Sequence, residues 1–272
     1  MKPGTRLGIV GVGKVGEAIV GGLLRRNFLP AGQISGSVLH EDSLQRVRDR
    51  LGIRATLDNR EAVKGCDVVL LAVKPQNMDA VLRDIADVLT PSQLVISVAA
   101  SSTAEFVEER IAGSIPVVRA MPNTPCLLGV GMTALCAGRH ATTEHLATAE
   151  ALFSCVGETA RVDAGLMDGV TALSASGPAY LYVVIESLAE AGVKLGIPRD
   201  VSTKLAAQTM LGAATMVLES KAHPALLKDT VTTPAGCTID GLLELEEGGL
   251  RVTLIKAVVR AAERARELVY KS

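Results

Sequence analysis

The stretch RLGIVGVGKVGEAIVGGLLRRNF, residues 6–28, passes from a short apolar run through a glycine-rich segment into a helical pattern. The apolar run Leu7–Val10 predicts a buried strand, and apolar residues recur at helical spacing after it. The glycines in between have the G-x-G-x-x-G spacing of a dinucleotide-binding turn: Gly11, Gly13 and Gly16. In such a turn the first glycine permits the bend, the second admits the pyrophosphate, and the third packs helix on strand. A plain glycine-rich turn is the alternative, but the flanking strand and helix favour cofactor binding.

The rest of the first half repeats this order of strand and helix. Apolar runs predict further strands within residues 32–38, 66–75, 93–101 and 115–125. Helices are predicted between them, one over residues 79–89, and Asp42–Gln45 and Ser102–Glu105 resemble capping boxes at two other helix starts. Strands that alternate with helices indicate a parallel sheet covered on both faces. We therefore expect an α/β Rossmann-type fold with a doubly wound parallel sheet.

In such sheets ligands bind beyond the carboxyl ends of the strands. Those ends are predicted at residues 11–13, 72–75, 99–101 and 121–125. The amides at the start of the first helix face the phosphates. The predicted cofactor contacts are Gly11, Val12, Gly13, Lys14, Val15, Ser37, Asn59, Ala72, Val73, Lys74, Pro75, Ala99, Ala100, Asn123 and, from the second half of the chain, Thr230.

The end of the second predicted strand bears on the choice between NAD(H) and NADP(H). An acidic residue there would bind the ribose hydroxyls of NAD(H). The segment SGSVLHED instead offers Ser35, Ser37 and His40 before its first acidic residues. Small hydroxyl side chains suit a phosphate, and Asn59 adds another hydrogen-bonding group. We predict that NADP(H) is preferred and NAD(H) possible, and the acidic residues 41–42 are alternatively the start of a helix.

From residue 164 the strand pattern stops and helical patterns follow. One long helix is predicted after Pro178, ending near Gly192 and Gly196, and a second within residues 197–220. Shorter helices fill the rest of the chain. We therefore predict two domains: residues 1–163 bind the dinucleotide, and residues 164–272 form an all-α domain.

Composition argues against several classes of protein. A net charge of −1, an aromatic content of 2% and the absence of tryptophan give no support to nucleic-acid binding. The apolar run at residues 68–73 is too short to span a membrane, and no leader pattern precedes the first strand. The 5 cysteines include no C-x-x-C pair, which indicates reduced thiols and a cytoplasmic protein.

Other catalytic or metal-binding patterns are weak. His140 and His145 stand in a solvated helix start without a cysteine or carboxylate cluster, so no metal site is predicted. Ser174 and Ser176 have no evident His/Asp partners, so they are not expected to act as nucleophiles.

Several sequence blocks occur in an order that identifies a family. These are LAVKPQ, MPNTP, ALSASGPAY and KDTVTTPAGCT. Over nearly its full length the chain resembles the pyrroline-5-carboxylate reductases, and the last two blocks together are the most specific. It departs from the family at Ala175 and Ala235, where glycine is usual. Each replacement adds one methyl group.

The resemblance implies a Rossmann domain followed by a helical dimerisation domain, with dimers that often assemble into rings. It also implies reduction of the cyclic imine 1-pyrroline-5-carboxylate to L-proline with NAD(P)H, the last step of proline biosynthesis. A nicotinamide held by the partner subunit would meet the substrate-facing loop. The loop residues are Thr233, Pro234, Ala235, Gly236, Cys237 and Thr238. Amides at 236–238 open a helix and can hold the substrate carboxylate. The hydroxyl of Thr238 can bond the ring nitrogen, which makes it the predicted catalytic residue.

Two alternatives remain beside this reading. A β-hydroxyacid dehydrogenase-like reductase, or another imine reductase, also joins a Rossmann domain to helices. Dehydrogenases of that kind commonly need a lysine on the first long interdomain helix, which here carries Glu186 and Glu190 and has Lys194 only at its end. A non-catalytic NADP(H)-sensing scaffold is the alternative from another class, and it has no need of the loop that ends in Thr238.

Overall fold

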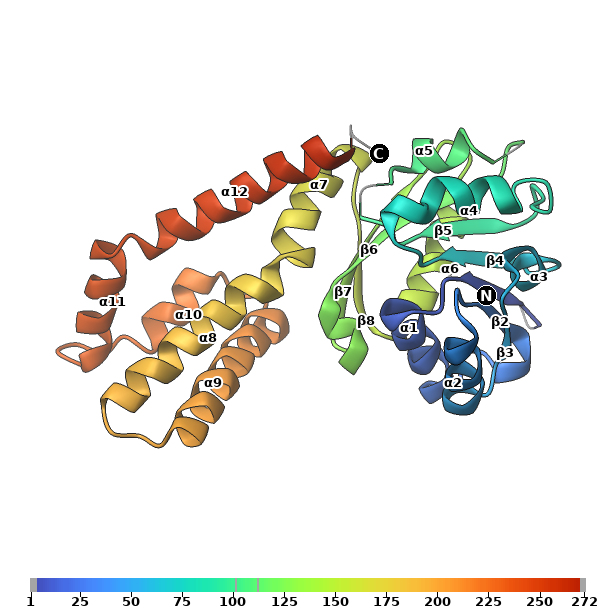
Figure 1. Ribbon diagram of the computed structural model, residues 1–272. Helices are drawn as coiled ribbons and strands as arrows, with labels where there is room; N and C mark the ends of the chain where they lie inside the picture. Colours follow the sequence, from blue (N-terminus) through green and yellow to red (C-terminus); the bar gives the residue numbers. More distant parts are fainter. Residues whose placement is uncertain (1–3, 101, 112, 270–272) are drawn as a thin grey trace. The chain divides into compact units, whose positions relative to one another are not determined.

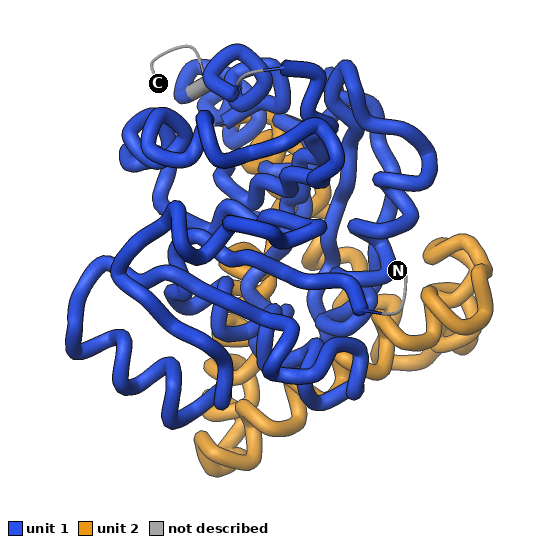
Figure 2. Tube along the Cα trace, turned by 90° about the vertical axis from the view of Figure 1, so that its right-hand side faces the viewer, with its two compact units in different colours: residues 1–176, 261–272 blue, residues 177–260 orange. Residues whose placement is uncertain are grey.

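The computed structural model describes residues 4–100, 102–111 and 113–269, and its elements are labelled in Figure 1. Contacts divide the chain into two compact units (Figure 2). Unit 1 comprises Met1–Ser176 and Ala261–Ser272, and unit 2 comprises Gly177–Arg260. Residues 164–176 cluster with unit 1 in this partition, and the domain division predicted after residue 163 stays a prediction.

Within the described residues, unit 1 contains an eight-stranded sheet with the order β3-β2-β1-β4-β5-β6-β7-β8. Strands β1 to β6 are parallel, whereas β7 runs antiparallel to β6 and β8 runs parallel to β7. The Rossmann-type prediction is confirmed, but the sheet is not parallel throughout. The strands are β1 (Leu7–Val10), β2 (Ile34–Ser37), β3 (Arg54–Thr56), β4 (Val68–Leu71), β5 (Leu94–Ser97), β6 (Val117–Pro122), β7 (Gly131–Ala137) and β8 (Gly157–Arg161).

The reversal at β7 follows from the short connection after β6. One 3₁₀ segment, η3 (Thr124–Leu128), is followed by Gly129 in the left-handed conformation, with φ of 79°. The Asn123 amide then donates to the Met132 carbonyl at 3.1 Å, so the chain returns beside the strand it has just left. A connection of this length joins antiparallel neighbours, because a parallel crossover needs a dozen or more residues.

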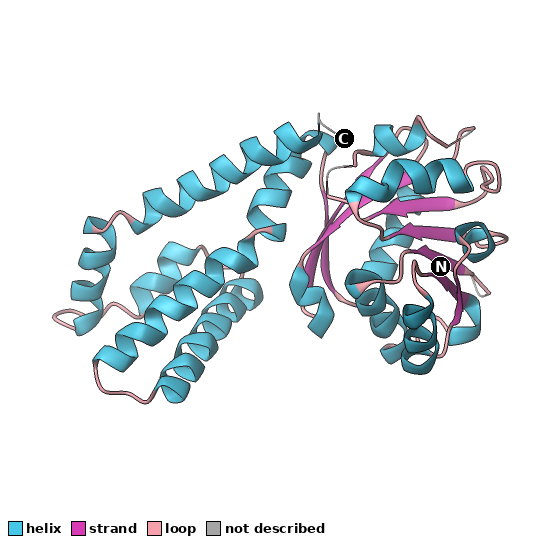
Figure 3. Cartoon of the chain, in the orientation of Figure 1, coloured by secondary structure: helices cyan, strands magenta, loops and turns pink. Residues whose placement is uncertain are grey.

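Helices cover both faces of the sheet, as Figure 3 shows. Successive strand residues point to opposite faces, so Ile9 joins the core beneath α1, α2 and α6, whereas Val10 joins the core beneath α4 and α5. Both cores are apolar, which explains the uninterrupted hydrophobic runs of the central strands. The helices of unit 1 are α1 (Lys14–Arg25), α2 (Glu41–Leu51), α3 (Asn59–Val63), α4 (Met78–Ile85), α5 (Ala104–Glu108), α6 (Thr143–Phe153) and α7 (Met167–Val170).

Both predicted capping boxes were wrong. Helix α2 begins at Glu41 after His40, which makes no side-chain cap, and Gln45 bonds Asp49 instead. Helix α5 is capped one residue later than predicted, since the Thr103 hydroxyl accepts from the Phe106 amide. The helix predicted over residues 79–89 also ends early, with α4 stopping at Ile85.

Unit 2 consists of helices joined by short loops. They are α8 (Gly177–Lys194), α9 (Arg199–Ser220), α10 (Pro224–Thr230), α11 (Cys237–Glu247) and α12 (Leu250–Val269), the last ending in residues assigned to unit 1. Gly192 lies inside α8, not at its end. Helix α9 packs so closely there that a Cβ on Gly192 would stand 2.0 Å from the Ser202 hydroxyl, which explains the glycine. Gly196, with φ of 89°, reverses the chain after α8. In the part of the chain that the structure describes, every helix is too short or too polar to cross a membrane.

Candidate active site

The glycine loop after β1 has the geometry that a pyrophosphate requires. Gly11 has φ of 88°, and a Cβ there would meet Val73 Cγ1 at 2.6 Å, so only glycine fits. At Gly13 a Cβ would meet nothing within 4 Å, which leaves the backbone open to a ligand. Gly16 lies against the Gly11 carbonyl, where a Cβ would stand 3.1 Å away, so α1 packs closely on the loop. The backbone conditions expected of such a turn are met, and the free amides of α1 open onto it, while cofactor binding at these residues stays a prediction.

Hydrogen bonds join the neighbouring strand ends into one edge. The Ala72 amide donates to Val10 at 2.9 Å, and the Val98 amide donates to Leu71 at 3.1 Å. These bonds bring together the predicted contacts at residues 11–15, 72–75 and 99–100, with Lys74 and Ala100 exposed. Ser101, the last residue predicted at this edge, lies outside the described residues.

The hydroxyls of the two β2 serines both donate to acceptors within the protein. The Ser35 hydroxyl donates to the Ala62 carbonyl at 2.6 Å, and the Ser37 hydroxyl donates to Asn59 Oδ1 at 2.7 Å. The backbone carbonyl of Ser37 also accepts from the Val12 amide at 2.8 Å. Ser37 and Asn59 therefore brace the glycine loop, and a contact of either side chain with NADP(H) stays a prediction. The acidic residues 41–42 lie in the first turn of α2, in agreement with the alternative prediction that they start a helix.

Arg119 is a further residue at this edge, and sequence analysis did not single it out. Its side chain is buried, and its Nη2 donates to the Ala100 carbonyl at 2.6 Å. Burial lowers the pKa of the Arg119 guanidinium, and the negative charges of Asp168 and Glu105 oppose that shift. The sequence does contain a sign of this buried charge, because an arginine seldom stands inside an apolar run such as VVRAMP unless it has a partner.

Asn123 ties the end of β6 to a wide helical turn. Its Oδ1 accepts from the Met132 amide at 2.8 Å, and its Nδ2 donates to the Ser174 carbonyl at 3.3 Å. Ser174 belongs to a π-helical turn, η5 (Thr171–Ala175), in which the Ser176 amide bonds the Thr171 carbonyl at 2.9 Å. Single π turns occur often at functional sites. The side chain of Asn123 is thus engaged within the protein.

The predicted substrate loop lies in unit 2 and is tightly turned. The Gly236 amide donates to the Thr233 carbonyl at 3.0 Å, with Pro234 second and Ala235 third in the turn. Ala235 has φ of 57°, a conformation that favours glycine. A Cβ on Gly236 would stand 2.5 Å from Thr233 Oγ1. The turn leads directly into α11, so the amides at 237–239 are without helical partners.

The three remaining predicted residues of the loop region differ in their burial and hydrogen bonding. Thr238 is half-buried in the first turn of α11, and Cys237 before it is exposed. Thr230 ends α10 and donates its hydroxyl to the Leu227 carbonyl at 2.6 Å. The predicted substrate residues are thus contiguous at a helix start, whereas Thr230 serves the preceding helix end.

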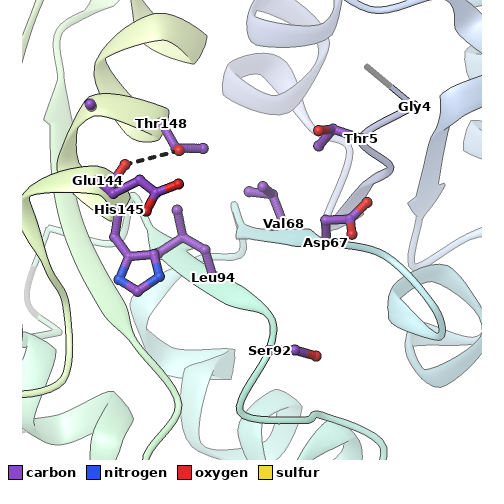
Figure 4. A pocket seen from close by; sticks show the side chains of 10 residues that line it. Gly4, Thr5, Asp67, Val68, Ser92, Leu94, Glu144, His145 and Thr148 are labelled. Carbon is purple, nitrogen blue, oxygen red and sulfur yellow. Dashed lines mark hydrogen bonds between the residues drawn. The ribbon is translucent and has the colours of Figure 1, made fainter. Parts of the chain in front are cut away.

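A polar pocket of about 550 Å³ lies at the opposite edge of the sheet, before β1, β4 and β5 (Figure 4). Asp67 lines one side and accepts from the Arg6 amide at 2.7 Å. Glu144 and His145 line the other side, where Thr148 bonds the Glu144 carbonyl. His145 also accepts from the Thr142 amide at 3.0 Å and so caps α6. The pocket contains none of the predicted site residues.

The sheet order and the glycine loop define a Rossmann-type dinucleotide-binding protein. The sequence profile described as "Pyrroline-5-carboxylate reductase dimerisation" matches residues 164–268, and "NADP oxidoreductase coenzyme F420-dependent" matches residues 6–101. The pyrroline-5-carboxylate reductase of Methanosarcina acetivorans is 41% identical over 263 residues, which cover 97% of each chain. The chain belongs to the pyrroline-5-carboxylate reductase family, and the resemblance found in its sequence is confirmed.

Solved structures agree with this assignment. A pyrroline-5-carboxylate reductase from Coxiella burnetii is 35% identical with a TM-score of 0.92, and the match covers 97% of this chain and 98% of that one. The Plasmodium falciparum pyrroline carboxylate reductase, solved with NADP bound, is 31% identical with a TM-score of 0.86 over the same shares of the two chains.

Proposed function

We propose that this chain reduces 1-pyrroline-5-carboxylate to L-proline with NADPH, the last step of proline biosynthesis. The observation that carries the proposal is the turn at residues 233–236, which leads into the free amides of α11. Full-length similarity to a reductase with that name supports it. An NADP(H)-sensing scaffold has no need of this loop, and α8 carries the lysine expected of a β-hydroxyacid dehydrogenase only at its end, as Lys194.

The substrate is an anion, and the start of α11 suits its carboxylate. The amides at 237–239 carry the positive end of the helix dipole, and α11 is long enough, at 11 residues, to develop one. The compact turn before it has no bulky side chain, so the imine ring can lie close to the backbone. We assign substrate binding to Thr233, Pro234, Ala235, Gly236, Cys237 and Thr238.

When bound, NADPH would supply the hydride for the imine carbon and be oxidised to NADP⁺. The imine nitrogen takes up one proton, so that the C=N bond becomes an amine. A protonated imine is already electrophilic, so the protein mainly has to orient the ring. We propose that the Thr238 hydroxyl hydrogen-bonds the ring nitrogen and orients or relays that proton, with water as the competing donor.

The cofactor edge fits a dinucleotide. The open backbone at Gly13 admits the pyrophosphate, and the α1 amides are directed to it. The proposed contacts are the residues predicted from the sequence, with Ser37 and Asn123 acting from within the protein. NADP(H) is the preferred cofactor in this proposal, supported by the NADP-bound relative, and NAD(H) is accepted less well. Steady-state kinetics with both cofactors measure the preference.

We propose that the working form is a homodimer joined through the helical unit. Leucines and other apolar side chains are exposed along its helices, among them Leu181, Val183, Leu188, Leu205, Leu211 and Leu243. An apolar surface of this kind marks an interface, and the dimerisation profile covers the same helices. Assembly of dimers into a ring and a cytoplasmic location belong to the proposal, the latter supported by five free cysteines.

The test is an assay of the purified protein with pyrroline-5-carboxylate. Loss of NADPH absorbance that depends on the imine, together with formation of proline, is the expected result. Cofactor binding without turnover would favour the scaffold, and oxidation of a β-hydroxyacid would favour the dehydrogenase. A higher catalytic efficiency with a six-membered cyclic imine would reassign the substrate while keeping the reaction.

A further inference from the structure

A chain of hydrogen bonds runs from the glycine loop to the surface of α4. The Gly11 amide is shared between the Ser37 carbonyl at 3.2 Å and Ser37 Oγ at 3.4 Å, and Ser37 Oγ donates to Asn59 Oδ1 at 2.7 Å. Asn59 Nδ2 then donates to Asp84 Oδ2 at 3.0 Å. Ser37 is buried, Asn59 is half-buried and Asp84 is exposed, so the chain crosses from interior to solvent.

The direction of these bonds is fixed by the group at the outer end. An ionised carboxylate only accepts hydrogen bonds, so Asp84 must face the amide nitrogen of Asn59. The amide oxygen of Asn59 is thereby turned toward Ser37, and the Ser37 hydroxyl must donate to it. Ser37 Oγ then presents only acceptor capacity to the Gly11 amide. All donors in the chain point outward, from the glycine loop to Asp84.

A neighbouring ion pair holds the same elements together without entering this chain. Arg60, next to Asn59 on α3, makes two bonds to the carboxylate of Asp87, in the turn after α4, at 2.5 and 2.7 Å. Arg60 also donates to the backbone carbonyl of Asp84 at 2.7 Å. The carboxylate of Asp87 therefore fastens α3 to the turn that follows α4, whereas the carboxylate of Asp84 orients one amide.

We propose that Asp84 is a positioning residue for cofactor binding, acting through Asn59 and Ser37 on the loop at Gly11. The end of the second strand faces the adenosine ribose of a dinucleotide in this fold. The hydrogen-bonding polarity of Ser37 and Asn59 at that place is set by a carboxylate that need not touch the cofactor. The inference rests on the proposed function only in taking the ligand to be NADP(H).

The test compares NADPH binding by the full-length protein and five variants, one of them a double variant. The change in NADPH fluorescence on binding gives the dissociation constant, because the reduced nicotinamide is excited at wavelengths that protein side chains do not absorb. Asp84→Asn lets the Asn59 amide take either orientation, and we expect about three- to tenfold weaker binding, the worth of one hydrogen bond. Asp84→Glu keeps an acceptor and should bind better than Asp84→Asn. Asp87→Asn, the matched control, should bind within about twofold of the unaltered protein.

A double-mutant cycle separates positioning from a general structural role. Because Asp84 acts through Asn59, the change Asp84→Asn should have no further effect in a protein that already carries Asn59→Ala. A full additional loss in that background would overturn the proposal, as would unaltered binding by Asp84→Asn or equal losses from Asp84→Asn and Asp87→Asn. If the unaltered protein binds NADPH but does not reduce the imine, the proposed function fails while the role of Asp84 is still measured.

Discussion

The Asn123 side chain joins two parts of unit 1 that are far apart in the sequence, because its Nδ2 bonds the Ser174 carbonyl at 3.3 Å. Its Oδ1 meanwhile accepts from the Met132 amide at 2.8 Å. The asparagine therefore satisfies one backbone donor in β7 and one backbone acceptor in the π turn. Such a residue fixes where the chain leaves the sheet for its first long helix.

Asn123→Ala should destabilise unit 1, since it removes both bonds. Leaving backbone groups without partners costs about 1–3 kcal/mol each when they are buried, so a clear drop in the free energy of unfolding is expected. Urea denaturation followed by circular dichroism measures it. Asn77→Ala is the control, because Asn77 is exposed and makes no capping bond. Equal stability of the two variants would contradict the assigned role.

Gly236→Ala should impair the substrate loop. The new Cβ would lie 2.5 Å from Thr233 Oγ1, and overpacking of this kind costs about 1–3 kcal/mol. The KM for the imine should rise while NADPH affinity is unchanged. Adding Thr233→Ala removes the clashing oxygen and should restore part of the loss.

Gly241→Ala is the matched control for that experiment. A Cβ at Gly241, inside α11, would meet nothing within 4 Å. Alanine there should leave the kinetics unchanged and stabilise the helix by about 0.5–1 kcal/mol. A Gly236→Ala variant with the kinetics of the Gly241→Ala variant would show that the turn tolerates a side chain.

Thr238→Ala should lower kcat/KM for the imine by the equivalent of about 1.5–3 kcal/mol, the value of a hydrogen bond to a charged group. NADPH affinity and folding should be nearly unchanged. Thr232→Ala provides the comparison, because the Thr232 hydroxyl bonds the Lys228 carbonyl and is not assigned to the site. Normal turnover by the Thr238 variant would remove the hydroxyl from the mechanism.

Sharing of one site between two subunits predicts complementation. Gly13→Asp puts a carboxylate where the pyrophosphate should approach, and Thr238→Ala damages the other half of the site. When the two variants are unfolded and reassembled together, about half the dimers are mixed, and about a quarter of all sites carry neither change. Activity should therefore recover toward a quarter of the unaltered value. No gain, with mixed dimers verified by mass, would place each whole site within one chain.

Thiol reagents should distinguish one cysteine from the other four. Burial raises the pKa of the Cys66, Cys126, Cys136 and Cys155 thiols, so little reactive thiolate forms there. Cys237 is exposed. An aromatic disulfide reagent should modify one thiol per native chain, and Cys237→Ser should abolish that fast phase. If the Cys237→Ser variant still released the reagent's aromatic thiolate rapidly, one of the buried cysteines would have to be accessible.

Features of the fold that depend only on residues close together in the chain could be predicted from the sequence. The roles of Gly11, Gly13 and Gly16 follow from their spacing and from the strand before them, and the structure confirms those backbone conditions. The start of α11 was predictable for the same reason, since small residues and a proline precede an apolar helical run. In each of these places the local residues determine the backbone conformation without help from distant contacts.

Features set by distant contacts were not predictable. Ser102 was expected to cap α5, but it is buried, and Thr103 caps the helix instead. Strands β7 and β8 were missed because β7 reverses direction and β8 is half-exposed. The hydrogen bond from Ser37 to Asn59 was not predictable, because nothing in the sequence shows that these two residues lie side by side.

The outermost strands, β3 and β8, have a consequence for how copies of the chain can associate. Both edges carry charge: Arg54 on β3 pairs with Glu61, and Arg161 on β8 pairs with Glu150. Charged, short edge strands resist the addition of a strand from another molecule. A protein that exposes so many leucines on its helices is thereby protected against open-ended growth through its sheet. Concentrated solutions should contain closed oligomers of defined mass and no fibres.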